Sequence, residues 1–163
     1  MTLLEIAIFL HVLLLVYWLG GDLGTFYSSR YVMKPDLSVE SRNTALKIMS
    51  FCDVFPRICL VLFLPSGITL MALDPLGRDL FGGWKLLVIW VLGLIWLALV
   101  VYEYRSHGAG GHIKVIQNVD LVIRILLVLG LVGAGVATVI LGGEPFGVQS
   151  NPRWLGAKVA LYG

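Results

Sequence analysis

The chain has 163 residues, of which 58% are hydrophobic and only 13% are charged, and its formal net charge is +2. A soluble domain of this size carries about a quarter charged residues, so the composition argues against a soluble globular protein. The small net charge also gives no indication of nucleic-acid binding. We therefore expect a protein whose main partner is the lipid bilayer.

Four apolar stretches are long enough to cross a bilayer, which takes about 20 residues of helix. They cover residues 3–27, 51–73, 84–104 and 121–141. None alternates apolar and polar residues as a membrane-barrel strand does, and open strands cannot span lipid because their backbone groups lack partners. The sequence predicts an all-α membrane protein, an antiparallel four-helix transmembrane bundle that forms a single domain over residues 1–163.

The first stretch has no basic leader and no small-residue cleavage site, so we expect it to be retained as a helix. Cys52 and Cys59 lie seven residues apart in the second stretch. Two helical turns separate them by about 10.5 Å, whereas a disulfide requires Cα atoms within about 7 Å. Both cysteines are expected to be reduced.

Basic residues in the loops predict how the helices are oriented. The loop after the first helix contains Arg30, Lys34, Arg42 and Lys47, and the loop after the third contains Arg105 and Lys114. The loop between the second and third helices balances Arg78 and Lys85 with Asp74 and Asp79. We expect a bacterial inner-membrane protein with its N-terminus and its 2–3 loop outside and its other two loops in the cytoplasm.

Two segments resemble each other within the chain. The second helix contains Asp53, Arg57 and Ile58, and the fourth contains Asp120, Arg124 and Ile125 in the same spacing. The first set is followed by Trp84-Lys85 and the second by Trp154 and Lys158. An internal repeat would make Trp154 the start of a fifth helix. Chance similarity of leucine-rich helices and a short interfacial segment over 154–163 are the alternatives.

A polar stripe follows one face of the first helix. Helical periodicity places His11, Trp18, Asp22 and Ser29 on this face, with Thr25 at its edge. A histidine at bilayer depth is costly, so it faces a partner rather than lipid. The partner is either a ligand or a neighbouring helix, to which the stripe donates hydrogen bonds. Gly20 and Gly24 predict close helix packing nearby.

On the third helix, Lys85, Trp96 and Glu103 share a face. Lys85 lies at a depth similar to that of His11, so it is either an interfacial anchor beside Trp84 or a second nitrogen ligand. His107 and His112 flank a glycine-rich loop and are expected to be solvated. Farther along the chain, the glycines of segment 130–135 predict a packing face rather than a phosphate site.

Charged residues gather towards the predicted cytoplasmic side. They are Asp22, Arg30, Asp53, Arg57, Glu103, Arg105, Asp120 and Arg124. The Asp53/Arg57 and Asp120/Arg124 spacings are those of ion pairs within one helix. The cluster either neutralises charge beside lipid or forms a polar pocket for a group such as a propionate or a quinone head.

The order of these features resembles the HemJ-type membrane proteins and their CopD-like relatives. A histidine in the first helix is followed by Trp18, glycines and Phe26-Tyr27-Ser-Ser-Arg30, and Trp84-Lys85 begins the third helix. The resemblance covers the first three helices. It implies a haem b with His11 and Lys85 as axial metal ligands, and a role like the oxidation of protoporphyrinogen. Trp18, Trp84, Trp96 and Asp22 complete the cofactor site that we expect.

The function that we expect is haem b binding in the outer half of the membrane, with redox or electron transfer as the outcome and a quinone or electron-transfer protein as a partner. One alternative is a non-catalytic subunit of a larger membrane complex or homo-oligomer. Another is a transporter for copper or another small solute. No paired Met-x-x-Met or Cys-x-x-Cys occurs, which disfavours a copper site built from soft ligands.

The predicted orientation can be tested by labelling single cysteines. We expect an impermeant thiol reagent applied from outside to label a cysteine placed at Gly77 and to leave one at Gly110 unlabelled. The reverse pattern would invert the orientation.

Overall fold

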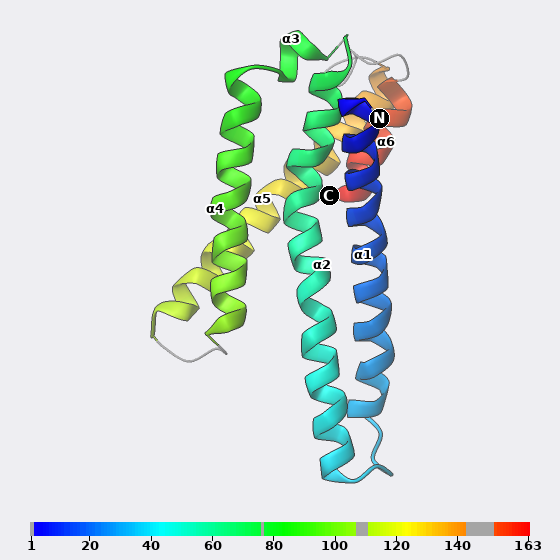
Figure 1. The fold of residues 1–163 in the computed structure, drawn as a ribbon, viewed down its shortest axis with the longest axis vertical. Helices are drawn as coiled ribbons and strands as arrows, with labels where there is room; N and C mark the ends of the chain where they lie inside the picture. Colours follow the sequence, from blue (N-terminus) through cyan, green and yellow to red (C-terminus); the bar gives the residue numbers. More distant parts are fainter. Residues whose placement is uncertain (1, 76, 107–110, 143–151) are drawn as a thin grey trace.

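The computed structural model describes residues 2–75, 77–106, 111–142 and 152–163, and the side chains of all of these except 111–113 and 152. Every regular element in these ranges is a helix, which confirms the all-α prediction (Figure 1). The helices are α1 (Leu3–Val32), α2 (Val39–Leu73), α3 (Arg78–Phe81), α4 (Trp84–Arg105), α5 (Gly111–Leu141) and α6 (Pro152–Tyr162).

Four of the described helices are long and apolar enough to cross a membrane. They are α1, α2, α4 and residues 114–141 of α5. Their outer faces carry large apolar side chains, and Leu19 and Leu129 expose 54% and 68% of their surfaces. Such a surface is stable in lipid and unstable in water, because apolar area left in water opposes folding. The chain is an integral membrane protein.

The helices extend beyond the apolar stretches at several ends. α1 continues to Val32, α2 begins at Val39 and α5 begins at Gly111, whereas the sequence predicted boundaries at 27, 51 and 121. The apolar stretch marks only the part in hydrocarbon, and the helical backbone continues into polar flanks. Ser38 begins α2 by accepting a hydrogen bond from the backbone N–H of Ser41 at 3.2 Å. The short α3 was not predicted.

α2 lies at the centre of the arrangement. It packs along α1 on one side and against α4 on the other, while α5 crosses the bundle at an angle and packs against α4 and α6 (Figure 1). The residues that fill the centre are apolar: Val61 is fully buried, and Trp96 and Val100 are 6% and 4% exposed. This core holds α2 and α4 together, with Ile123 and Leu127 of α5 packed against it.

Glycines allow α1 to approach α2 closely, but not both of the predicted ones. A Cβ atom on Gly21 would collide with the Pro56 ring, and one on Gly24 would lie 3.0 Å from Cys52 Sγ. Gly20, which the sequence predicted to be in the contact, has open space around it. The prediction was therefore wrong by one residue for Gly20 and correct for Gly24. Cys52 and Cys59 are free thiols, as predicted.

The C-terminal segment forms a helix, α6, which begins close to the predicted start at Trp154. Gly135 of α5 and Gly156 of α6 bring the two backbones together. At the other end of α6, the Tyr162 hydroxyl donates a hydrogen bond of 2.6 Å to the backbone carbonyl of Leu60 in α2. α6 is therefore anchored to two membrane-spanning helices.

The tight α5–α6 contact predicts unequal effects at two neighbouring glycines. In Gly135→Val the new side chain meets backbone, because a Cβ there lies 2.6 Å from Ala160 N and Gly156 O. Overpacking of this kind costs about 1–3 kcal/mol. Gly133→Val is the control, since a Cβ there has nothing within 4 Å. Unfolding in mixed micelles with increasing SDS should show a loss of stability only for Gly135→Val, and equal losses would contradict the contact.

Candidate ligand-binding cleft

His11 of α1 faces α2, so a neighbouring helix is one partner of the predicted polar stripe. Its Nδ1 atom lies 2.8 Å from Ser66 Oγ, and its ring stacks on Phe63 with centroids 4.0 Å apart. A Cβ atom on Gly67 would lie 3.3 Å from His11 Cε1, so glycine leaves the room that the imidazole occupies. The histidine therefore joins two helices through a hydrogen bond and an aromatic contact.

The hydrogen bonds around Ser66 determine which nitrogen of His11 carries a proton. The Ser66 hydroxyl donates its one proton to the Phe63 carbonyl at 3.0 Å. With the proton in this direction the Ser66 oxygen accepts the hydrogen bond from His11, and the imidazole proton lies on Nδ1; a Ser66 proton directed at Nδ1 gives the other tautomer. With the proton on Nδ1, Nε2 is left with a free electron pair, the form of nitrogen that binds a metal or accepts a proton.

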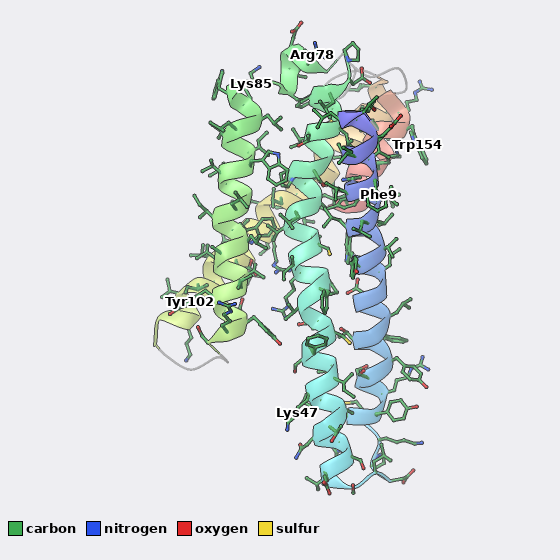
Figure 2. All side chains as sticks on the ribbon, viewed as in Figure 1. Phe9, Lys47, Arg78, Lys85, Tyr102 and Trp154 are labelled. Carbon is green, nitrogen blue, oxygen red and sulfur yellow. The ribbon has the colours of Figure 1, made fainter. Side chains whose placement is uncertain are left out.

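Lys85 lies at the start of α4, away from His11. Its Nζ donates hydrogen bonds to the carbonyls of Asp79 and Leu80, at 3.4 and 3.1 Å, and so caps α3. α2 lies between α1 and α4 (Figure 1), and Figure 2 shows Lys85 at the end of α4. Its neighbour Trp84 is 70% exposed. The structure does not bring Lys85 to His11, and their joint role as metal ligands stays a prediction.

Trp96 and Glu103 of α4 both bind α5. Trp96 Nε1 donates a hydrogen bond of 2.7 Å to Asp120 Oδ1, and Glu103 Oε1 accepts one of 3.0 Å from Gln117 Nε2. Asp120 Oδ2 also accepts a hydrogen bond of 2.7 Å from Arg124 Nε. Asp120 is only 8% exposed, so its carboxylate depends on these two partners.

The second ion pair is more open to its surroundings. Arg57 Nη2 lies 2.6 Å from Asp53 Oδ2, and the two side chains are 42% and 40% exposed. Both intrahelical ion pairs predicted from the spacing are therefore present. The Asp53–Arg57 pair belongs to α2 and the Asp120–Arg124 pair to α5.

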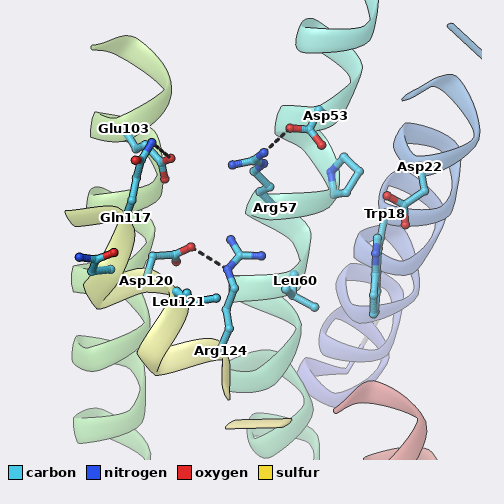
Figure 3. A pocket seen from close by; sticks show the side chains of 12 residues that line it. Trp18, Asp22, Asp53, Arg57, Leu60, Glu103, Gln117, Asp120, Leu121 and Arg124 are labelled. Carbon is cyan, nitrogen blue, oxygen red and sulfur yellow. Dashed lines mark hydrogen bonds and ion pairs between the residues drawn. The ribbon is translucent and has the colours of Figure 1, made fainter. Parts of the chain in front are cut away.

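The two ion pairs border one open cavity of about 580 Å³, which residues of α1, α2, α4 and α5 line (Figure 3). It is lined by Trp18, Asp22, Asp53, Pro56, Arg57, Leu60, Glu103, Gln117, Asn118, Asp120, Leu121 and Arg124. A second cavity of about 540 Å³ shares Asp53, Arg57, Glu103 and Gln117 with the first and reaches Thr25 and Arg105. We call the two connected cavities the charged cleft.

The guanidinium groups of Arg57 and Arg124 extend into this cleft towards each other (Figure 3). Each contacts one aspartate through one nitrogen, Nη2 in Arg57 and Nε in Arg124. Among the described residues, neither arginine has a further hydrogen-bond or ion-pair partner. Most of their N–H donors are therefore available to a molecule in the cleft.

Three aromatic rings separate the cleft from His11. Trp18 contacts Phe63 and Tyr162 edge-on, with centroids 5.8 and 6.1 Å apart, and Phe63 stacks on Tyr162 at 5.5 Å. Trp18 lines the cleft, while Phe63 stacks on His11. The two polar regions predicted from the sequence are thus adjacent, with one aromatic layer between them.

Sequence reasoning missed Ser66, Gln117 and Tyr162 as partners of the predicted residues. Their signals are weak, since each is a single polar residue in an apolar or mixed segment. His107 lies outside the described residues, and the side chain of His112 is not described. In the part of the chain that is described, no group of three or more His, Cys, Asp or Glu side chains could hold a metal ion.

No family model, curated protein or solved structure matches this chain. The resemblance to HemJ-type proteins therefore stays a prediction.

Proposed function

We propose that this integral membrane protein binds one lipid-soluble molecule whose polar head lies in the charged cleft. The observation that carries the proposal is the position of the charges. Two ion pairs and two further carboxylates surround a cavity between membrane-spanning helices. Ionisable groups in such segments are costly and are characteristic of functional sites.

Charge neutralisation alone accounts for the ion pairs but not for the cavity. Neutralisation needs only the short contacts within each pair, of 2.6 and 2.7 Å, and no open volume beside them. Here the arginines keep unpaired donors that face open space. The volume of about 580 Å³ falls within the range of small-molecule sites, which is about 300–1,000 Å³. Trp18, Pro56 and Leu60 add apolar walls for the rest of the molecule.

Trp18 can report occupancy of the cleft. We expect lipid-soluble quenchers added to the protein in nanodiscs to quench its fluorescence in a saturable way, and Trp18→Phe to remove the saturable part. Leu60→Phe should weaken binding by filling the cavity, which it lines. Leu126→Phe is the control, because Leu126 is 65% exposed and does not line the cleft. Quenching that rises only linearly with quencher would contradict a binding site.

A haem b protein with a redox role is the second candidate that we propose, and the free electron pair on His11 Nε2 favours it. Metal-binding histidines commonly donate their other N–H to a fixed oxygen, as His11 does to Ser66. His11 would supply one axial ligand. Lys85 bonds to α3 and the aromatic layer separates His11 from Arg57 and Arg124, so neither Lys85 nor the two arginines is assigned to the haem in this proposal. Bound haem would supply one-electron chemistry.

An absorption spectrum tests the haem proposal. We expect protein purified from haem-supplied cells to show a Soret band with α and β bands, and His11→Ala to lose them because the axial nitrogen is gone. Lys85→Ala should keep the Soret band, since Lys85 bonds to α3 rather than facing His11. A colourless wild-type protein would exclude haem without affecting the proposal for the cleft.

We also propose a bacterial inner-membrane location with the N-terminus outside, which the loop charges favour. In this orientation the cleft lies in the cytoplasmic half of the membrane. A quinone, an electron-transfer protein or further membrane subunits would then be its partners.

A further inference from the structure

We infer that the head of the bound molecule is a neutral, planar ring with two carbonyl acceptors, a quinone-type head held between Arg57 and Arg124. The inference rests on the proposed binding function of the charged cleft and adds the chemistry of its ligand. Three properties of the cleft support it: the direction of the donors, the balance of charge and the nature of the walls.

The donors require a ligand with acceptors on two sides. A guanidinium group has five N–H donors and no acceptor. Asp53 and Asp120 each engage one nitrogen of their arginine, and the remaining donors extend into the cleft from two facing helices (Figure 3). A molecule with a single acceptor would satisfy one guanidinium only. Two acceptors at opposite edges of one ring satisfy both.

The balance of charge favours a neutral head. The cleft's first cavity is lined by the carboxylates of Asp22, Asp53, Glu103 and Asp120 but by only two guanidinium groups. Its formal charge is therefore −2. A carboxylate or phosphate ligand would increase this excess. A cationic head would reduce it but has no acceptor for the guanidinium donors, whose N–H groups would stay unpaired. A neutral acceptor adds no negative charge and receives charge-assisted hydrogen bonds.

The walls favour a flat ring with an apolar tail. Trp18 presents an aromatic surface to the cleft, and aromatic rings stack on planar π systems. Pro56, Leu60 and Leu121 are the apolar lining residues on α2 and α5. An isoprenoid or alkyl tail can lie against such residues and continue into the lipid. No apolar surface of the tail is then exposed to water.

The test uses two probes in nanodiscs, a short-chain benzoquinone and a spin-labelled fatty acid, with Trp18 fluorescence as the readout. We expect saturable binding of the quinone only. Loss of one charge-assisted hydrogen bond is worth about 1.5–3 kcal/mol, so Arg124→Lys, which keeps the charge but not the planar fork, should weaken quinone binding about tenfold or more. Asp53→Asn/Arg57→Gln should have a similar effect and leaves no unpaired charge that could prevent folding.

Arg30→Gln is the matched control. Arg30 lies over the Phe26 ring near the end of α1 and does not line the cleft, so quinone affinity should stay within twofold of the wild type. Saturable binding of the fatty acid but not of the quinone would overturn the neutral head while leaving the cleft as a binding site. Quinone binding that is unaffected by all arginine variants would overturn the arginine contacts. The absence of saturable binding for both probes would also count against the proposed function.

Discussion

An ionised carboxylate inside a membrane-spanning bundle is stable only when its oxygens are bonded, and Asp120 shows how this protein meets that requirement. One oxygen accepts from the Trp96 indole and the other from Arg124. The first bond crosses from α4 to α5 and lies beside the core formed by Val61, Trp96 and Val100. Together with the Glu103–Gln117 hydrogen bond it fixes how α5 is rotated against α4, and Arg124 extends into the cleft from this orientation.

The same requirement explains the geometry at His11. Hydrocarbon offers no water to its ring nitrogens, so α2 supplies Ser66, whose own proton goes to the backbone. When the Ser66 proton goes to the Phe63 carbonyl, the polar contact that holds α1 to α2 also leaves the far nitrogen of His11 unprotonated. A structural hydrogen bond and a chemically competent nitrogen are therefore consequences of one arrangement.

The sequence predicted best those features that depend on residues close together in the chain. The Asp53–Arg57 and Asp120–Arg124 pairs follow from helical spacing alone, and the polar stripe of α1 predicted correctly that His11 faces a partner. The partner of His11 lies 55 residues away and depends on how far α2 is rotated about its axis. One residue of rotation also decides that Gly21 rather than Gly20 meets Pro56. The hydrophobic periodicity of a helix does not contain its rotation relative to a neighbouring helix. A helix as short as α3 leaves no periodic signal in the sequence, so the contacts of Lys85 with α3 could not be predicted.

The charged cleft arises because helices that cross at an angle can touch closely at only one level. α2, α4 and α5 meet at the core around Val61 and Val100. Towards the predicted cytoplasmic side α5 stays beside α4 and runs away from α2 (Figure 1). Apolar side chains fill the crossing point, whereas the diverging ends leave a volume into which Arg57, Glu103 and Arg124 extend. Both proline-containing turns of α2 remain helical, so the opening comes from the crossing rather than from a break in α2. Rigid helices with a fixed crossing therefore give a cleft whose donors are oriented before any ligand arrives, which reduces the ordering cost of binding.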